Sequence, residues 1–390
     1  MKNSIIALVD CDSFFVSCEQ AVDESLQGKP VCVISGTRGC VLARSKEAKK
    51  LGIKMGMPYF MAKKEYPDGI YVNANMKLYA DFSRNVMRIL RDFSPTVEVY
   101  SVDEAFVELS GLKRLYNYNY YQIAKQIREE VKCQLGINVS IGLSRSKVLA
   151  KLACERAKKT GGIYIIGKSK IPKELKATRI EEIWGIGYKT TQLLNRWGIL
   201  ACDKLVEKSD EWLKIKVGKR GVELKHELLG ECLDLVSTKR KPPKSIQNTR
   251  SFPQFTNDIN YIKNALNIHI HNSCTKLRYL QGRCKAVSLM LKTKDFIVYG
   301  EKKNLSASAN FEIEISKEIM EMLEKIYLPD VLYRSCGVTL ENISYDKEAQ
   351  LTLFPEKSKL KNCDKLADSI DKLECKFGRN IIKTGFFKTE

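Results

Sequence analysis

Acidic side chains within apolar runs are the residues of this sequence best suited to chemistry. Asp10 ends the apolar run 5–9, and Asp103 and Glu104 stand side by side in the run 97–109, which otherwise reads as a buried strand. An isolated ionised carboxylate is costly to bury, so adjacent acids on a strand indicate a bound cation. We predict that these three acids meet on neighbouring strands and hold divalent metal.

Magnesium is the metal that this donor set favours. Carboxylate oxygens are hard ligands, and the sequence has only three histidines and no Cys-x-x-Cys pair that would suggest zinc. Two Mg²⁺ ions about 3.5–4 Å apart, held by Asp10, Asp103 and Glu104, would serve in-line phosphoryl transfer. The alternative is structural: Asp10 caps the helix that follows the first strand, and Asp103 and Glu104 occupy a turn.

Charge is unevenly distributed along the 390 residues, whose formal net charge is +20. Residues 1–110 hold 14 basic and 14 acidic side chains, whereas residues 236–310 hold 14 basic and 3 acidic ones. A neutral, acid-bearing half joined to a basic module suits an enzyme that grips a polyanion. The alternative is a solvated surface that is kept positive for solubility.

Composition indicates a globular protein of two to four domains. A hydrophobic content of 44% supports folded cores, and the chain is too long for a single ordinary one. Every apolar run is far shorter than the ~20 residues of a membrane span, and the run 5–9 is too short for a secretory signal. We therefore expect a cytoplasmic protein with reduced thiols and no membrane partner.

Strands and helices that could position the acids follow a clear order along the chain. Residues 1–168 alternate strands with helices, and residues 169–232 read as helical. A basic, Pro-broken linker covers 237–244, and residues 245–343 follow the order βαββαβ. The expected fold class is therefore α+β with several domains, followed by a separate tail from residue 346.

A helix-hairpin-helix is expected inside the helical region. The stretch 183–187 reads Ile-Trp-Gly-Ile-Gly, an apolar-Gly-apolar-Gly pattern between two short helices. Its two glycines, Gly185 and Gly187, would let backbone N–H groups approach a nucleic-acid phosphate without regard to sequence. The alternative is a plain helix-turn-helix packing corner.

The tail contains two further features. Residues 350–354 form a short apolar peptide between Lys/Glu-rich flanks. Residues 360–377 carry apolar side chains at three- and four-residue steps and end before Gly378, which predicts an amphipathic helix. This helix could dock on the chain itself or on a partner.

Four ordered motifs resemble the Y-family, the translesion DNA polymerases. They occupy residues 8–15 (LVDCDSFF), 39–52 (GCVLARSKEAKKLG), 100–106 (YSVDEAF) and 140–151 (SIGLSRSKVLAK). The resemblance is closest to the UmuC-like subgroup, the catalytic-subunit type of bacterial DNA polymerase V. It covers about residues 4–345, with a family-like tail beyond.

The resemblance implies a right-hand polymerase. The expected parts are a ferredoxin-like palm (1–26 and 75–168), small fingers (27–74), a helical thumb with the helix-hairpin-helix (169–232), a basic linker (233–244), a βαββαβ little-finger domain that grips DNA (245–345), and a tail with a clamp-binding peptide and an amphipathic helix (346–390).

The resemblance also implies roles for the acids and for two neighbours. Asp10, Asp103 and Glu104 match the metal-binding, catalytic carboxylates, and the Cys11 carbonyl would complete the nucleotide-side metal. Phe15 matches the steric-gate aromatic, whose bulk excludes a ribose 2′-OH and so selects dNTPs. The alternative for Phe15 is an ordinary core aromatic.

Cations for the nucleotide triphosphate are expected in both palm and fingers. Lys158 matches the family's triphosphate lysine, and Lys49 stands where many relatives have Arg. Lys46 stands where many relatives have Tyr, a departure for which Arg44 would compensate. The alternative for Arg44 and Lys46 is a solvated charged face.

Expected partners are primer–template DNA, dNTPs, the bacterial sliding clamp and a UmuD-like accessory protein. The candidate DNA contacts are Gly185, Gly187, Lys189, Lys241, Lys244 and Arg250. The candidate clamp anchors are Gln350, Leu351, Leu353 and Phe354, which resemble the clamp-binding peptide of bacterial polymerases. The alternative is a tail that folds back onto the protein.

The function implied is template-directed DNA synthesis of low fidelity without proofreading, used for translesion synthesis in SOS-type DNA repair. Its chemistry would be two-metal nucleotidyl transfer. One alternative is a catalytically idle scaffold that binds DNA and the clamp. Another is a nucleotidyl cyclase on a related palm sheet, which leaves the hairpin, the basic module and the clamp peptide unexplained.

Overall fold

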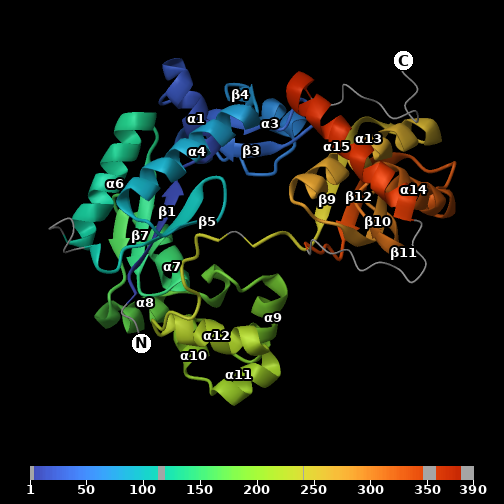
Figure 1. Ribbon diagram of the computed structural model, residues 1–390. Helices are drawn as coiled ribbons and strands as arrows, with labels where there is room; N and C mark the ends of the chain where they lie inside the picture. Colours follow the sequence, from blue (N-terminus) through green and yellow to red (C-terminus); the bar gives the residue numbers. More distant parts are fainter. Residues whose placement is uncertain (1–3, 113–118, 240, 346–356, 379–390) are drawn as a thin grey trace. The chain divides into compact units, whose positions relative to one another are not determined.

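The computed structural model describes residues 4–112, 119–239, 241–345 and 357–378, and it forms two compact units, Met1–Arg240 and Lys241–Glu390 (Figure 1). Within these described ranges, no helix has both the length and the apolar character that crossing a membrane requires. Every cysteine whose side chain is described is a free thiol.

A five-stranded sheet organises the first unit. Its strands lie in the order β5-β6-β1-β7-β8, and only the β7–β8 pair is parallel. Three helices share one core on one face of the sheet, and α7 packs on the other face. The elements are β1 (Ile6–Cys11), α1 (Phe14–Val22), α4 (Met76–Phe93), β5 (Val97–Val99), β6 (Glu104–Glu108), α6 (Tyr120–Leu135), β7 (Val139–Ser144), α7 (Lys147–Ala157) and β8 (Ile163–Ile165).

Strand β1 is the centre of this sheet, and all six of its residues are buried. Ala7 and Val9 contribute to the core with α1, α4 and α6, whereas Ile6 and Leu8 pack with α7 residues. Burial on both faces explains why the run reads as continuously apolar rather than alternating. Side chains at even positions therefore point toward α7.

A smaller sheet, with the strand order β3-β2-β4, follows in the sequence. It has its own apolar core and lies within residues 27–74, which the resemblance assigns to small fingers. The elements are η1 (Glu24–Leu26), β2 (Val31–Ile34), β3 (Val41–Arg44), α2 (Lys46–Lys50), α3 (Tyr59–Glu65) and β4 (Ile70–Asn73).

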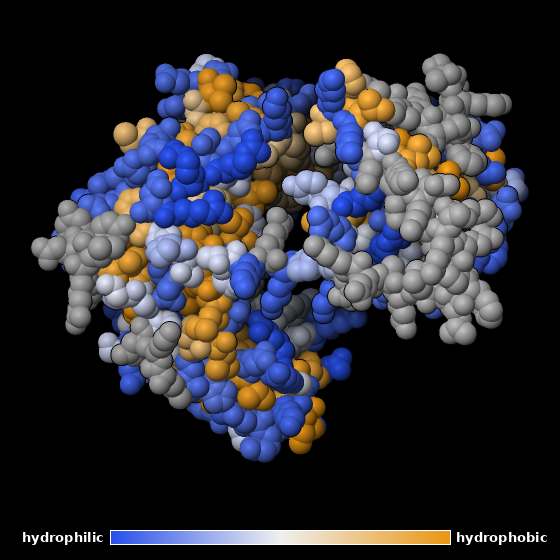
Figure 2. Space-filling model, viewed as in Figure 1, coloured by the Kyte–Doolittle hydropathy of each residue, from blue (hydrophilic) through white to orange (hydrophobic). Residues whose placement is uncertain are grey.

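Helices alone form the last part of the first unit, and their buried side chains share a core with α7. Apolar side chains such as Leu200 and Ile215 are nevertheless exposed here, and orange atoms appear among hydrophilic ones in the lower part of Figure 2. The elements are η2 (Lys168–Lys170), α8 (Ile171–Ala177), η3 (Ile180–Glu182), α9 (Tyr188–Arg196), α10 (Cys202–Val206), α11 (Asp210–Lys216) and α12 (Lys219–Leu228).

The second unit contains the βαββαβ order that the sequence predicts. Its four strands form an antiparallel sheet in the order β11-β10-β12-β9, and both helices pack against it through one apolar core. The elements are β9 (Ile246–Thr256), α13 (Ile259–Tyr279), β10 (Cys284–Thr293), β11 (Val298–Ala309), α14 (Glu312–Ile326) and β12 (Tyr333–Glu341), followed by α15 (Lys357–Phe377).

Helix α15 docks on the second unit itself, which decides between the two placements left open for the amphipathic tail segment. Arg278 of α13 makes two hydrogen bonds to Asp371 of α15, at 2.7 and 2.8 Å, and two more to Glu312 of α14, each at 3.0 Å. Ala367 and Ile370 of α15 pack on Phe311. The tail helix is therefore held by buried, charge-assisted hydrogen bonds as well as by apolar contact.

His271 makes this docking sensitive to pH. Its Nδ1 lies 3.2 Å from Oε1 of Glu312, and its Nε2 lies 2.9 Å from Oε1 of Glu374 on α15. The hydrogen bond with Glu312 and the charges of both carboxylates raise the pKa of His271 against the opposing effect of burial. The protonated imidazole therefore stabilises the docking of α15. This contribution is fully present below the ordinary histidine pKa of 6.5, and it is lost as pH rises through the raised pKa of His271.

We expect α15 to become more mobile as pH rises above the ordinary histidine pKa of 6.5, with the transition removed in His271→Gln. A dye on the exposed Cys375, with the exposed Cys133 replaced by Ser, would report this as a fall in fluorescence anisotropy. His226→Gln is the matched control, because His226 lies in the first unit and its pKa is also raised. An anisotropy profile that is flat in the parent protein, or unchanged by His271→Gln, would contradict this expectation.

Candidate active site

Asp10 and Glu104 lie opposite each other on adjacent strands. The antiparallel register of β1 and β6 pairs Asp10 directly with Glu104, so the two side chains project from the same face of the sheet, toward α7. Asp10 is only 7% exposed, although it is an acid. The meeting of two acids predicted from the sequence is therefore built by strand register.

Two lysines contributed by the α7 segment contact these acids. Nζ of Lys158, the residue that caps α7, lies 3.0 Å from Oδ2 of Asp10, and Nζ of Lys151 lies 2.7 and 2.8 Å from the two oxygens of Glu104. Lys158 also donates to Glu155 at 2.8 Å. The buried acids therefore have charge partners, as burial requires.

The pKa values of the two carboxyl groups are shifted in opposite directions. Burial, followed by its hydrogen bond with Glu104, raises the pKa of Asp10 to about 8, although Lys158 opposes this rise. Burial would also raise the pKa of Glu104, but hydrogen bonds from Asp10 and Lys151 more than offset it and leave that pKa below its ordinary value. Two adjacent carboxyl groups with little exposure to water form a site suited to a hard divalent cation.

Asp103 is placed differently from what the sequence suggested. We expected one strand over residues 97–109, but the structure has two strands, β5 and β6, joined by a turn that contains Asp103. The turn forms because the N–H groups of Tyr100 and Ser101 both donate to the Glu104 carbonyl, each at 3.1 Å. The Asp103 carbonyl accepts from the Cys11 N–H at 2.9 Å, which fixes the turn beside β1.

The Asp103 carboxylate accepts a hydrogen bond from the Ser101 hydroxyl. Within the described part of the chain, no three acidic, histidine or cysteine side chains are grouped closely enough to hold a single ion. Asp10 and Glu104 are thus brought into contact, while Asp103 lies in the same cavity with its carboxylate turned to Ser101.

All nine residues predicted to bind metal or nucleotide line one cavity of about 670 Å³ in the first unit. Acidic oxygens and cationic side chains line the same cavity, a donor set that fits hard divalent cations and a triphosphate. The nine residues are Asp10, Cys11, Phe15, Arg44, Lys46, Lys49, Asp103, Glu104 and Lys158.

Phe15 lines this cavity from the first turn of α1, and its ring packs against the ring of Tyr79. The Phe15 and Tyr79 rings stack with centroids 4.2 Å apart and planes 13° apart. Tyr79 is itself buried, and its hydroxyl donates to Glu19 at 2.6 Å. Phe15 therefore sits against a fixed, flat support.

The fingers cations differ in how they are held. A guanidinium nitrogen of Arg44 donates to the Ile53 carbonyl, whereas Lys46 and Lys49 extend from the short helix α2. Ser45 caps that helix by accepting from the Ala48 N–H at 3.1 Å. Arg44 thus holds the loop at Ile53 while it lines the cavity.

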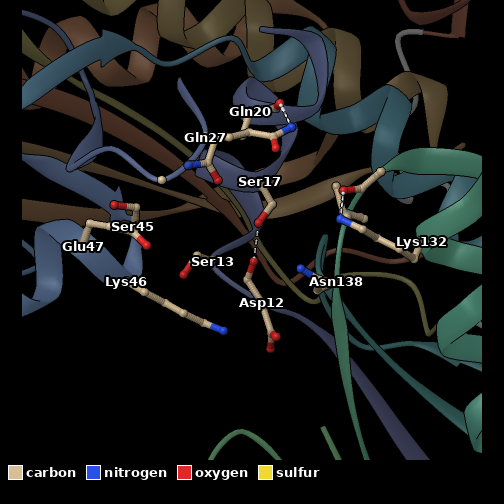
Figure 3. Close-up of a pocket in the computed structure, with 13 residues that line it drawn as sticks. Asp12, Ser13, Ser17, Gln20, Gln27, Ser45, Lys46, Glu47, Lys132 and Asn138 are labelled. Atoms are coloured by element: carbon tan, nitrogen blue, oxygen red, sulfur yellow. Dashed lines mark hydrogen bonds between the residues drawn. The ribbon is translucent and has the colours of Figure 1, made fainter. Parts of the chain in front are cut away.

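A second hollow, of about 230 Å³, adjoins the first through Asp12, Ser13, Ser45 and Lys46 (Figure 3). The carboxylate of Asp12, two residues after Asp10, accepts from the Ser140 hydroxyl at 2.7 Å, and the Asp12 carbonyl accepts from the Ser17 hydroxyl at 2.6 Å. Asp12 is therefore committed to holding β7 and α1 beside β1.

The predicted DNA contacts are exposed where the structure describes them. Gly185 adopts a φ of +98°, a conformation that other residues rarely adopt, and no atom lies within 4 Å of where its Cβ would stand. Gly187, in contrast, has an ordinary extended backbone at the start of α9. Lys189, Lys241, Lys244 and Arg250 are exposed.

Arg250 lies on the helix side of the sheet in the second unit. It pairs with the buried Cys336, and its near neighbour Asn248 lies 2.6 Å from His269 of α13. The open side instead carries mostly polar residues of both charges together with Met290 and Val298, namely Gln247, Thr249, Ser251, Ser288, Met290, Lys292, Val298, Gly300, Lys302, Ser335, Gly337, Thr339 and Glu341. The clamp anchors Gln350, Leu351, Leu353 and Phe354 lie outside the described residues.

Sequence reasoning missed two residues at this site, Tyr79 and Tyr100, and one contact of a third residue, Lys151. Tyr79 supports Phe15, Lys151 binds Glu104, and Tyr100 contacts Lys151 through its ring. Lys151 lies seven residues before Lys158, so the helical period already places both on one basic face; its hydrogen bonds to Glu104 are what the structure adds. Nothing in the local sequence marks Tyr79 or Tyr100, since both contacts depend on long-range pairing.

Comparison with known families and curated proteins gives a consistent result. The sequence matches the impB/mucB/samB family over residues 9–155 and the C-terminal domain of that family over residues 243–353. It is 33% identical to DNA polymerase IV of Dehalococcoides mccartyi, covering 97% of this chain and 96% of that protein. It is 32% identical to protein UmuC of Salmonella typhimurium, covering 97% and 92%.

Solved structures give the same result for the fold. A Y-family DNA polymerase chimera, Dbh-Dpo4(243-245)-Dbh, aligns with a TM-score of 0.75 and 27% identity, covering 88% of this chain and 100% of that one. An insertion ternary complex of Dbh DNA polymerase aligns with a TM-score of 0.58 and 26% identity, with the same coverage.

Proposed function

The chain belongs to the impB/mucB/samB family of Y-family DNA polymerases, and we propose that its translesion DNA synthesis is carried out in the cavity that Asp10, Asp103 and Glu104 share with Phe15 and Lys158. The observation that carries this proposal is that all nine predicted metal- and nucleotide-binding residues line that one cavity. An idle scaffold would have no need to keep these acids and cations together.

We propose that the divalent metal on which this family depends is bound here as two Mg²⁺ ions. Asp10, Asp103, Glu104 and the Cys11 carbonyl would hold them, with Asp103 rotating away from Ser101. When bound, such ions make a primer 3′-OH more acidic and stabilise the departing pyrophosphate. Carboxylate and carbonyl oxygens are the donors that Mg²⁺ prefers.

The side chains around the acids would bind and orient the nucleotide. Lys158, Arg44, Lys46 and Lys49 carry positive charge into the cavity and would neutralise the triphosphate of a dNTP. Phe15, held by Tyr79, would lie against the sugar and exclude a 2′-OH. Attack of the primer 3′-OH on the α-phosphorus would then form the new phosphodiester bond and release pyrophosphate.

Both units would contact the DNA backbone rather than its bases. Gly185, Gly187 and Lys189 would meet phosphates at the hairpin, and Lys241 and Lys244 at the linker. The open face of the sheet in the second unit would serve the same role, because Lys292 and Lys302 lie on it among mostly polar residues. A polar face of this kind suits DNA of any sequence, including damaged DNA.

Primer extension tests the proposal. Purified protein, a labelled primer–template and dNTPs with Mg²⁺ should give extension that follows the template, stops in EDTA and continues past a template lesion. DNA binding without extension would favour the idle scaffold. Synthesis without a template, or cyclic nucleotide formation, would contradict the polymerase assignment.

A sliding clamp is a proposed partner through residues 350–354. We expect deletion of these five residues to spare distributive synthesis but to abolish stimulation by a bacterial clamp, because the Gln, Leu and Leu-Phe anchors would fill a preformed apolar groove. Replacing the adjacent Lys347 and Glu348 by Ala is the matched control and should keep full stimulation. Clamp stimulation that survives the deletion would defeat this assignment. A UmuD-like accessory protein is a further proposed partner, supported by the similarity to protein UmuC.

A further inference from the structure

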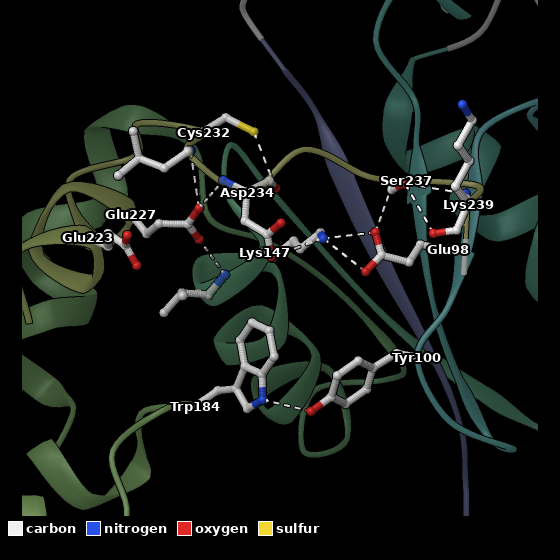
Figure 4. A network of polar contacts seen from close by, with 12 residues as sticks. Glu98, Tyr100, Lys147, Trp184, Glu223, Glu227, Cys232, Asp234, Ser237 and Lys239 are labelled. Atoms are coloured by element: carbon white, nitrogen blue, oxygen red, sulfur yellow. Dashed lines mark hydrogen bonds and ion pairs between the residues drawn. The ribbon is translucent and has the colours of Figure 1, made fainter. Parts of the chain in front are cut away.

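Tyr100, in the turn between β5 and β6, contacts the thumb segment. Trp184 Nε1 donates a hydrogen bond of 3.1 Å to the Tyr100 hydroxyl, and the two rings meet edge to face with centroids 5.5 Å apart (Figure 4). Both rings also contact Phe106 of β6, with centroids 5.8 Å away in each case. The turn that contains Asp103 is thus packed directly on a thumb residue.

Lys151 joins this aromatic cluster to the catalytic carboxylate. Its Nζ lies 5.5 Å from the centroid of the Tyr100 ring and 2.7 Å from the nearer oxygen of Glu104. The side chains of Lys151 and Glu104 are only 21% and 13% exposed, so water screens their interaction weakly. One lysine is therefore fixed from two sides, by a carboxylate and by an aromatic face.

Trp184 belongs to the helix-hairpin-helix loop predicted to meet DNA. Its neighbours Ile183 and Ile186 are buried in the thumb core, and Gly185 follows it with the left-handed φ of +98°. A shift of this loop must therefore move the indole that touches Tyr100. The loop and the Glu104 carboxylate are joined through only two intervening side chains.

The β-hairpin formed by β5 and β6 is held in place by other contacts besides those of Tyr100. The neighbouring Glu98 of β5 accepts two hydrogen bonds from the buried Lys147, at 2.8 and 3.0 Å, and one from the Ser237 N–H at 2.7 Å (Figure 4). Tyr100 itself is 47% exposed. Removing its ring should leave β5 anchored and the protein folded.

We propose that Tyr100 is a positioning residue for the polymerase reaction: its ring fixes Lys151, Lys151 fixes the Glu104 carboxylate, and Trp184 makes this arrangement depend on the seating of the thumb hairpin. The inference rests on the proposed role of Glu104 as a metal ligand. It adds a connection between the part of the thumb that would hold DNA and the acids that would hold the ions.

Tyr100→Leu tests the inference. We expect the Mg²⁺ concentration that gives half-maximal extension to rise about 3- to 10-fold, as loss of one cation–π contact and of the order that it imposes would produce, while KM for dNTP stays within twofold. Calorimetric titration of Ca²⁺ into the enzyme–DNA complex without nucleotide should show the same weakening. This second measurement reads ion binding without turnover.

Companion variants separate positioning from packing. Tyr100→Phe keeps the ring over Lys151 and should retain near-normal ion binding, whereas Trp184→Leu should behave like Tyr100→Leu. Tyr121→Leu, a half-exposed tyrosine on α6, is the matched control and should change nothing. A lower melting temperature for Tyr100→Leu with unchanged Mg²⁺ and Ca²⁺ dependence would overturn the inference and leave a purely structural cluster.

Failure of this inference is distinguishable from failure of the proposed function. If Asp103→Asn abolishes extension while Tyr100→Leu leaves both ion titrations unchanged, the metal assignment stands and only the positioning role is lost. If Asp103→Asn extends primers normally, the metal assignment falls and the positioning role falls with it.

Discussion

Replacing Asp103 by asparagine should lower the rate of primer extension at least about a thousand-fold, a loss of about 4 kcal/mol of transition-state stabilisation. The substitution keeps the size of the side chain and its hydrogen bond with Ser101 but removes one of the charges that would hold the ions. Affinity for primer–template DNA should change little, because the candidate DNA contacts lie on other elements. Single-turnover extension and a DNA-binding titration on the same preparation would measure both.

Asp12→Asn is the matched control for this prediction. Asp12 is also an acid at the cavity, but it is held by the Ser140 hydroxyl and has no proposed metal role. Its substitution should cost far less activity than that of Asp103. Equal losses in the two variants would indicate a general electrostatic effect in place of specific ligation, and normal extension by Asp103→Asn would remove Asp103 from the reaction.

Much of the fold was predictable because it follows from local patterns in the sequence. The apolar run 5–9 predicts a buried strand, and the βαββαβ order of residues 245–343 is confirmed element by element from β9 to β12. The fold class is confirmed as well, since the solved structures that align are Y-family polymerases. Period, length and turn residues carry this information without any knowledge of tertiary contacts.

The site was predictable in its residue types but not in its detailed arrangement. Pairing of Asp10 with Glu104 follows from strand register, which long-range pairing sets, so the sequence could suggest that the acids meet without showing which of them touch. The turn at Asp103 was misread as strand because Val99 and Val102 favour strands, whereas two backbone hydrogen bonds to the Glu104 carbonyl override that preference.

Side-chain partners lay beyond sequence reasoning for the same reason. Lys151 falls on the same basic helical face as Lys158, but its hydrogen bonds to Glu104, 47 positions away in the sequence, depend on the fold. The tail helix α15 showed its amphipathic period clearly, but the period does not state which surface will cover the apolar side. Arg278 and His271 of α13 supply that information, and only the folded chain brings them beside α15.

Phe15→Ala should raise incorporation of ribonucleotides relative to deoxyribonucleotides by roughly 5- to 150-fold. A ribose 2′-OH pressed against a rigid ring costs about 1–3 kcal/mol in overpacking, and alanine removes that clash. The rigidity comes from Tyr79, whose ring stacks on Phe15 at 4.2 Å and whose hydroxyl is bound to Glu19. Competition between each rNTP and its dNTP in single-nucleotide extension measures the selectivity directly.

Variants of Tyr79 then show whether stacking or mere bulk excludes the 2′-OH. Tyr79→Phe keeps the stacked ring and should retain full selectivity, whereas Tyr79→Leu frees Phe15 to move and should raise ribonucleotide use by a smaller factor than Phe15→Ala. Ribonucleotide incorporation should therefore be lowest in the parent protein and Tyr79→Phe, higher in Tyr79→Leu and highest in Phe15→Ala. This order is expected if the Phe15 ring blocks the 2′-OH and the Tyr79 ring keeps Phe15 from moving. Selectivity unchanged in Phe15→Ala would show that the ring is only part of the core, and full selectivity in Tyr79→Leu would show that the gate needs no support.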